Sequence, residues 1–171
     1  MSATASAESL NRLTSIVVQS AINVHKTLGP GLLESAYLSC LCHELSREAV
    51  AFETQKALRL IYRGVQIDCA YRVDLLVAES VIVEVKAMQS MAPIHTQQLY
   101  TYLRIADCRV GLLLNFGART MKEGIKRVVN DFPEWWAEWP PCDPRDPCVD
   151  KTLRPLPPSA SMSKSTHRSD A

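Results

Sequence analysis

Residues 71–87 read YRVDLLVAESVIVEVKA, two apolar runs separated by a short polar break. Both runs are rich in Val, Leu and Ile, which favours strands over roughly Cys69–Val77 and Val81–Val85. The three residues between them, Ala78-Glu79-Ser80, suit the loop of a β-hairpin. We therefore expect an antiparallel strand pair at the centre of the fold.

Charged side chains interrupt the apolar pattern of this hairpin. In a symmetric register Asp74 lies directly opposite Glu84, with Cβ atoms roughly 4.5–5.5 Å apart. Because side chains alternate along a strand, Lys86 shares the face of Glu84, and Arg72 lies opposite Lys86. The sequence thus predicts that two acids and a lysine converge on one patch of the sheet.

The apolar neighbours of this patch make close carboxylates costly. Two such groups repel, and one takes up a proton unless a cation is present. Mg²⁺ typically binds one or two carboxylates and keeps several waters. The bound cation can polarise a phosphoryl oxygen and lower the pKa of a coordinated water, while Lys86 orients that water or stabilises developing charge. The alternative is a cross-strand ion pair on a solvated face, which would use the same residues.

Helical patterns surround the hairpin. Residues 9–28 carry apolar side chains at helical spacing, and Gly29-Pro30-Gly31 ends that helix. A second helix is expected from Leu32 to about Ala49. The other expected elements are a strand over Ala57–Tyr62 with a turn at Arg63-Gly64, a helix over Thr96–Ala106, a strand over Val110–Leu114 and a helix over Thr120–Asp131. This order predicts a mixed α/β fold in which helices flank a central sheet.

Two of these helices carry polar residues of interest. Glu34 lies one turn before Tyr37, on the apolar stripe, although the helix dipole also favours an acid in a first turn. Gln98 would face the same way as His95 and Tyr102. A glutamine there can hold a metal-bound water or a phosphate. More often, such a residue lies on the surface of a helix or caps it without a role in a site.

The bulk composition is that of a soluble globular protein. Of the 171 residues, 47% are hydrophobic and 22% charged, and a formal net charge of +1 excludes a polycation. Any nucleic-acid contact must therefore be local. The N-terminus lacks the features of a secretory signal, and no apolar run is long enough for a membrane span. We expect reduced cysteines and a cytoplasmic protein.

The chain is expected to contain one domain and a tail. The expected segments are a flexible N-terminus at 1–8, the domain at 9–131, a tryptophan-containing extension at 132–141 and a Pro/Ser-rich disordered tail at 142–171. The extension could pack on the domain, on a second copy in a homodimer or on a protein partner, through Trp135, Trp136 and Trp139.

Several segments together resemble a known family. Residues 31–37 read GLLESAY, a GxxExxY motif, and YRVDLLV and VEVKA follow at residues 71–77 and 83–87. QLYTYL at residues 98–103 and GLLLNFG at residues 111–117 complete the set. Over roughly residues 10–130 the chain resembles the small bacterial GxxExxY proteins, a branch of the PD-(D/E)xK nuclease superfamily.

The resemblance implies a restriction-endonuclease-like core and a site for Mg²⁺ or Mn²⁺. Asp74 takes the first acidic position, and Glu84-Val85-Lys86 takes the ExK element. Glu34 matches an acid on an early helix, and Gln98 a polar residue on the helix after the hairpin. Val73, not proline, precedes Asp74, but that proline is not a ligand. The implied metal ligands are Asp74, Glu84 and Glu34, and candidate substrate contacts are Tyr37, Arg72, His95 and Tyr102.

Two functions fit these observations. One is a metal-dependent nuclease that hydrolyses phosphodiester bonds of DNA or RNA with a metal-activated water. The other is a non-catalytic nucleic-acid-binding or protein-interaction module that keeps the fold, which the near-neutral charge favours. Disappearance of a nucleic-acid substrate that depends on an added metal would favour the nuclease over the non-catalytic module.

Overall fold

A five-stranded mixed sheet forms the centre of the computed structural model, which describes residues 6–67 and 71–130. The strand order is β1-β4-β5-β6-β7, and β5 and β6 are the parallel pair. The strands of this sheet are β1 Phe52–Ala57, β4 Arg72–Val77, β5 Val81–Lys86, β6 Val110–Asn115 and β7 Ile125–Val129. A separate two-stranded sheet contains β2 Leu60–Tyr62 and β3 Val65–Ile67.

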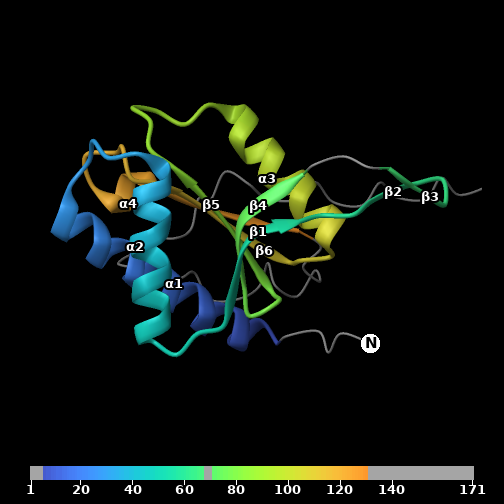
Figure 1. Ribbon diagram of the computed structural model, residues 1–171, viewed down its shortest axis with the longest axis horizontal. Coiled ribbons are helices and arrows are strands. Elements are labelled where there is room, and N and C mark those ends of the chain that lie inside the picture. Colours follow the sequence, from blue (N-terminus) through green and yellow to red (C-terminus); the bar gives the residue numbers. More distant parts are fainter. Residues whose placement is uncertain (1–5, 68–70, 131–171) are drawn as a thin grey trace, which may run out of the picture.

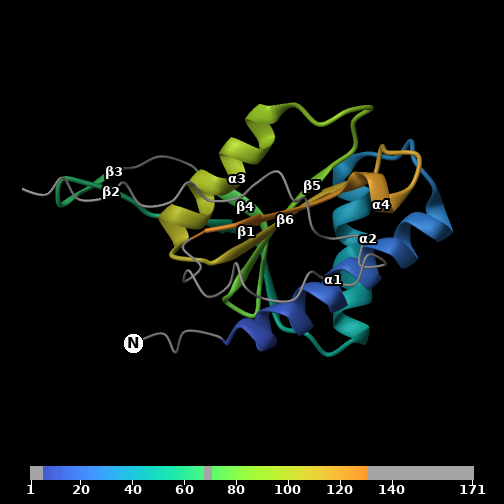
Figure 2. The same cartoon turned by 180° about the vertical axis from the view of Figure 1, so that it is seen from behind.

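Helices cover both faces of the large sheet, as Figure 1 shows and as Figure 2 shows from behind. The helices are α1 Ala7–Leu28, α2 Glu34–Arg47, α3 Pro93–Ala106 and the short α4 Met121–Gly124. Apolar side chains of α1 and α2 pack against Val83 and Val85 of β5, whereas α3 packs on the opposite face beside Ile82. Since side chains alternate along a strand, Glu84 and Lys86 lie on the α3 face.

The two N-terminal helices are joined by a loop that Tyr37 holds. Helix α1 ends at Gly29, whose φ of 66° is the left-handed conformation that glycine adopts readily. The Tyr37 ring is fully buried and stacks on Phe116 with the ring centroids 4.5 Å apart. Its hydroxyl donates to the Gly29 carbonyl at 2.5 Å and accepts from the Leu32 amide at 3.1 Å. Tyr37 therefore fixes the entry to α2.

The hairpin of β4 and β5 has the predicted register. Leu75 pairs with Val83 and Val77 with Val81, around the loop at residues 78–80. The ladder ends at the Leu75–Val83 pair, and beyond it the two strands diverge towards different neighbours. Arg72 pairs with Ala57 of β1. The β4–β5 ladder does not reach Arg72 and Lys86, so the prediction that these two residues lie opposite each other is wrong.

Two predicted elements differ from the structure. The expected strand over Ala57–Tyr62 is instead the last residue of β1 and the whole of β2, with Leu58 and Arg59 between them. The expected helix over Thr120–Asp131 is one short helical turn, α4, followed by β7. β7 pairs antiparallel with β6, because the fully buried β6 presents a row of backbone groups that need partners. Pairing of β7 with β6 therefore outweighed the helical periodicity of residues 120–131.

The turn predicted at Arg63-Gly64 is present, between β2 and β3. The predictions for residues 1–5 and for the segments after residue 130 concern residues outside the described part of the chain. These include Trp135, Trp136 and Trp139. Within residues 6–67 and 71–130, no helix combines the length and the hydropathy needed to span a bilayer.

Candidate active site

Asp74 and Glu84 meet where the β4–β5 ladder ends. Asp74 Oδ2 accepts a hydrogen bond from the Val85 amide at 2.9 Å. The Asp74 amide in turn lies 3.4 Å from Glu84 Oε1, which accepts from it. The two carboxylates therefore replace backbone partners between the strands. This reciprocal arrangement places both acids at one point, as the hairpin register predicted.

Lys86 completes the charged cluster on β5. Its Nζ lies 3.3 Å from Glu84 Oε2, and the Lys86 and Glu84 side chains are 16% and 6% exposed. Burial disfavours the charged ammonium, but attraction to Glu84 and Asp74 outweighs it and raises the pKa of Lys86 above its ordinary value. Lys86 is thus a cation in this arrangement, suited to stabilising negative charge.

Glu84 is the most perturbed acid of this cluster. Burial, followed by repulsion from Asp74, raises the pKa of Glu84 from 4.5 to about 7, against the opposing effect of Lys86. The carboxyl group therefore carries a proton for part of the time near neutral pH. Such a perturbed acid beside a second carboxylate is common at functional sites.

Glu34 approaches from the other helical layer. It is the first residue of α2, and its Oε1 accepts from the Ala87 amide at 3.1 Å, directly after Lys86. The Glu34 side chain is exposed, so its predicted place on the apolar stripe is wrong; the buried stripe of α2 consists of Tyr37, Leu41 and Leu45. Its charge nonetheless acts on Lys86, whose pKa it helps to raise.

Helix α3 contributes a hydrogen-bonded pair. Gln98 Nε2 donates to the Tyr102 hydroxyl at 2.6 Å, and Tyr102 is 5% exposed. Burial raises the pKa of Tyr102, and the charges of Glu84 and Lys86 act on it as well. The pair therefore stands beside the charged cluster on the α3 face of the sheet.

The other predicted contacts are placed differently. Among the residues that the structure describes, neither His95 nor Arg72 makes a hydrogen bond or ion pair with Asp74, Glu84 or Glu34. His95 is half-buried in the first turn of α3, and Arg72 is exposed at the start of β4. The Tyr37 hydroxyl is engaged by the loop before α2, which supports a packing role.

Gln55 is a site neighbour that the sequence pattern missed. Its Nε2 donates to Asp74 Oδ1 at 3.1 Å. Gln55 has a φ of 50°, which is rare for a residue with a side chain and interrupts the β1–β4 pairing next to Asp74. No strand was predicted over residues 52–56, so nothing in the sequence directed attention to this glutamine.

The comparison with protein-family models decides the family. Residues 11–128 match the PD-(D/E)XK nuclease superfamily. The chain belongs to this superfamily. The predicted restriction-endonuclease-like fold class is thereby confirmed, while membership of the GxxExxY branch stays a prediction. Comparisons with curated proteins and with solved structures gave no significant match.

PD-(D/E)XK nucleases generally use divalent metal ions, and the donor set here can be tested against that use. Within the described segments, no group of three or more His, Cys, Asp or Glu side chains is arranged to hold a metal. The adjacent Asp74 and Glu84 carboxylates nevertheless fit a hard cation of the Mg²⁺ type, which needs only one or two carboxylates beside its waters. Glu34 is not part of such a group in the described segments, and its Oε1 accepts from the Ala87 amide.

Asn115 holds the chain that follows Lys86. Its buried side chain accepts from the Met88 amide at 3.0 Å and donates to the Met88 carbonyl at 2.8 Å. It also accepts from the Gly117 amide at 3.1 Å. These bonds hold the turn that follows β6. They also position Lys86, because the Phe116 amide donates to the Lys86 carbonyl at 2.7 Å.

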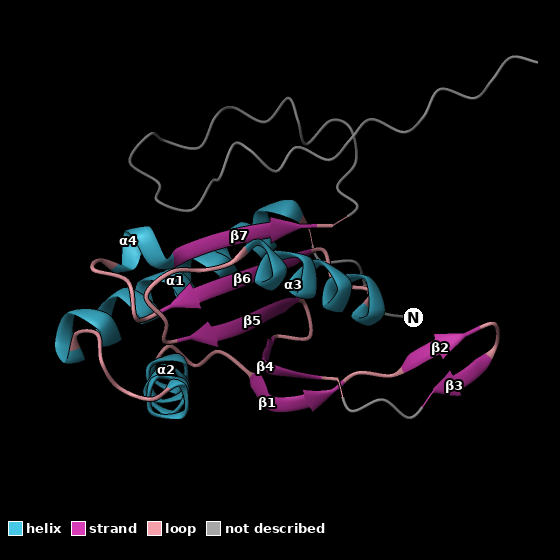
Figure 3. Ribbon diagram, turned by 90° about the horizontal axis from the view of Figure 1, so that it is seen from above, coloured by secondary structure: helices cyan, strands magenta, loops and turns pink. Residues whose placement is uncertain are grey.

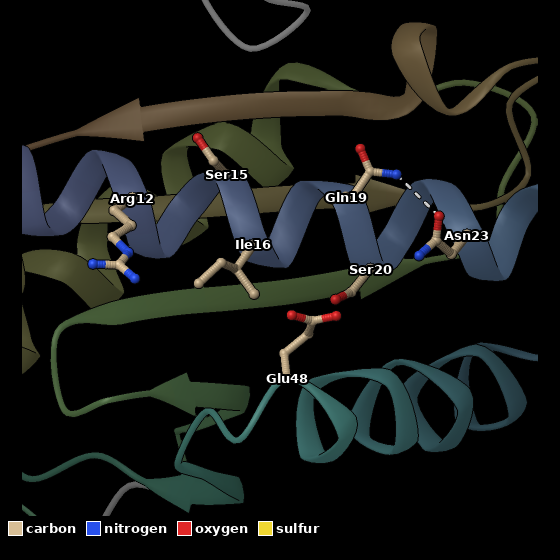
Figure 4. A pocket seen from close by; sticks show the side chains of 7 residues that line it. All are labelled: Arg12, Ser15, Ile16, Gln19, Ser20, Asn23 and Glu48. Atoms are coloured by element: carbon tan, nitrogen blue, oxygen red, sulfur yellow. Dashed lines mark hydrogen bonds between the residues drawn. The ribbon is translucent and has the colours of Figure 1, made fainter.

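A hollow on the opposite side of the sheet is not part of the charged cluster. Figure 4 shows it between α1 and the end of α2. The residues that line it are Arg12, Ser15, Ile16, Gln19, Ser20, Asn23 and Glu48. Helix α1 covers the sheet face opposite to Glu84, so the charged cluster and this hollow are separated by the sheet.

Proposed function

We propose that the protein is a metal-dependent nuclease that hydrolyses phosphodiester bonds of DNA or RNA by means of a metal-activated water. The observation that carries this proposal is the pair of Asp74 and Glu84, two carboxylates held together although Glu84 is buried and its pKa is raised to about 7. A divalent cation would relieve this repulsion. The superfamily match over residues 11–128 supports the same chemistry.

Asp74 and Glu84 would hold the cation, with Mg²⁺ or Mn²⁺ as the candidates. A cation held there would polarise a phosphoryl oxygen of the substrate and lower the pKa of a coordinated water. Asp74 is well placed to keep its orientation, because Gln55 and the Val85 amide bind its two carboxylate oxygens. Cation binding also requires Glu84 to release its proton, so the affinity should rise with pH around neutrality.

Lys86 is proposed to stabilise the negative charge that develops on the phosphoryl oxygens. Its raised pKa keeps it protonated, which suits an electrostatic role better than proton abstraction. Glu34, tied to the Ala87 amide, is proposed as a further ligand or as a group that positions Lys86. Gln98 and Tyr102 are proposed to hold a water or a phosphate oxygen from the α3 side.

The experiment pairs calorimetry with cleavage. Mg²⁺ or Mn²⁺ is titrated into the wild type, Asp74→Asn and Lys86→Met, and each protein is incubated with single- and double-stranded DNA and RNA. Glu53→Gln and Lys56→Met serve as matched controls, because Glu53 and Lys56 form an exposed ion pair on β1, 2.6 Å apart. The controls should bind and cleave like the wild type.

We expect Asp74→Asn to lose metal binding and cleavage, and Lys86→Met to lose cleavage while keeping the metal. Cleavage that persists in chelator would contradict the proposal. If the wild type binds no metal at millimolar concentration, the cluster is an ion-pair network. The non-catalytic nucleic-acid-binding or protein-interaction module then replaces the nuclease.

A further inference from the structure

The β2–β3 hairpin, here called the arm, projects from the body of the protein (Figures 1 and 3). It forms its own two-stranded sheet between β1 and β4. Its two-residue turn has φ values of 48° at Arg63 and 80° at Gly64, the signs of a type I′ turn. An isolated two-stranded hairpin is only marginally stable in water, so the arm gains from a partner that covers it.

One face of the arm is entirely apolar. Leu60 pairs with Ile67 and Tyr62 with Val65, and cross-strand partners and alternate residues share a face. Tyr62 is 59% exposed, Val65 61% and Ile67 40%. Large apolar side chains that gather on an exposed surface mark an interaction site more often than scattered ones do.

The one charged residue of the arm is Arg63 at its turn. In the sequence, Arg59 directly precedes β2 and Asp68 directly follows β3. The Arg63 guanidinium lies 5.4 Å from the centroid of the Tyr62 ring. An arginine beside an aromatic ring can contact a phosphate and the apolar methyl groups of a major groove. The positive charge at the tip of the arm therefore suits a polyanionic partner.

The base of the arm adjoins the charged cluster. The Leu58 amide donates to the Tyr71 carbonyl at 2.8 Å, and the buried Leu58 side chain belongs to the core that also contains Val73 and Leu99. Tyr71 is 40% exposed, and its ring lies 5.9 Å from that of Tyr102. Asp74 follows three residues after Tyr71 along the chain, so the arm emerges beside the candidate site.

The size of the arm argues against a stable dimer contact. A standard protein interface needs about 800 Å² and roughly 20–30 residues from each partner. The arm offers far fewer. A two-stranded ribbon, however, fits the major groove of duplex DNA, whereas the major groove of A-form RNA is too deep and narrow to admit side chains.

We propose that the β2–β3 arm binds the groove of duplex DNA beside the phosphodiester bond that the site cleaves. This inference rests on the proposed nuclease function and names duplex DNA as its substrate class. Each strand of the arm has three residues, which gives the arm a length of about 10 Å. At 3.4 Å for each base pair, its tip reaches about three base pairs beyond its base.

The test uses variants that keep the hairpin. Tyr62→Thr removes the ring with a residue that favours strands, and Arg63→Asn removes the charge with a residue suited to a type I′ turn. Arg47→Asn is the matched control, because Arg47 is exposed in the last turn of α2 and paired with Glu44. All variants are made with and without Lys86→Met, and circular dichroism checks that each one is folded.

Binding is measured by fluorescence anisotropy with Mg²⁺ in the Lys86→Met background, on a length series of DNA duplexes and on matched RNA duplexes and single strands. We expect the double arm variant to bind long DNA duplexes about tenfold more weakly, and the shortest duplexes unchanged. Arg63→Asn should lower the slope of log Kd against log salt by about 0.9. Arg47→Asn should change neither quantity.

Four results would overturn the inference. If the wild type cleaves DNA but the arm variants bind every duplex normally, only the role of the arm fails. If the arm variants affect RNA duplexes or single strands equally, duplex DNA is the wrong class. If light scattering shows a wild-type dimer that the arm variants dissociate, the arm binds a second copy. If the wild type neither binds nor cleaves nucleic acid, the proposed function fails with it.

Discussion

Replacement of Glu84 by glutamine should stabilise the metal-free protein at pH 8. Glutamine resembles the protonated form of Glu84 in shape and charge, so it removes the cost of holding a buried carboxylate beside Asp74. The pKa of Glu84 rises from 4.5 in the unfolded chain to about 7 in the fold, a difference of about 2.5 units. At about 1.4 kcal/mol for each unit, the ionised group costs about 3 kcal/mol of the free energy of unfolding.

The sign of the pH dependence follows from the raised pKa. Between pH 4.5 and about 7 the native state holds the proton more tightly than the unfolded chain does. The free energy of unfolding of the wild type therefore falls as the pH rises through this window. Glu84→Gln lacks this group, so the two proteins should have similar stabilities below pH 4.5 and differ by about 3 kcal/mol above pH 8.

The assay is urea unfolding in chelator at pH 4.5 and pH 8, followed by circular dichroism. With a urea slope of about 2 kcal/mol per molar, the midpoint of Glu84→Gln should exceed that of the wild type by about 1.5 M at pH 8. The exposed Glu53→Gln should shift it by no more than about 0.3 M. A Glu84→Gln protein that is less stable than the wild type at pH 8 would refute the reasoning. Added Mg²⁺ should narrow the gap, because only the wild type retains both carboxylates.

Three further variants test the scaffold of the site. Tyr37→Phe should lower the free energy of unfolding by about 1–3 kcal/mol in thermal or urea melts, because the loop before α2 loses two hydrogen bonds. An unchanged unfolding midpoint would mean that other contacts hold this loop. Asn115→Ala should lower the free energy of unfolding by a similar amount, because it removes two hydrogen bonds to Met88 and one to Gly117. It should also reduce cleavage at saturating metal. Full activity would show that the loop after β5 does not position Lys86. Gly117→Ala should destabilise by more than about 1 kcal/mol, because its Cβ would collide with the Met88 backbone, and a soluble variant with wild-type stability would contradict that close approach.

The hairpin register could be predicted from the sequence because local rules determine it. The short loop at residues 78–80 and the period-two alternation leave few ways to pair the two strands, and Asp74 and Glu84 meet as expected. The placement of Glu34 near the cluster was inferred from a family resemblance. Its burial was predicted wrongly, because helical spacing gives the direction of a side chain but not how far a helix end extends beyond the core.

The errors share a different cause. β7 and the separation of β1 from β2 depend on pairing with strands that are distant in the sequence, which periodicity does not report. Gln55 reaches Asp74 from β1 for the same reason. Arg72 was placed opposite Lys86 by extending the register beyond the point at which the strands separate, and no sequence signal marked that point.

The alternation along β5 ties folding fidelity to chemistry. Val81, Val83 and Val85 face the α1–α2 layer, while Glu84 and Lys86 face α3. A slip of one residue in the register would exchange the two sets and place an acid and a lysine against the valine-lined core. Misregistered molecules would therefore be too unstable to persist as inactive native-like protein. In a preparation that unfolds in one cooperative transition, the fraction of folded molecules should equal the fraction with an assembled charged cluster.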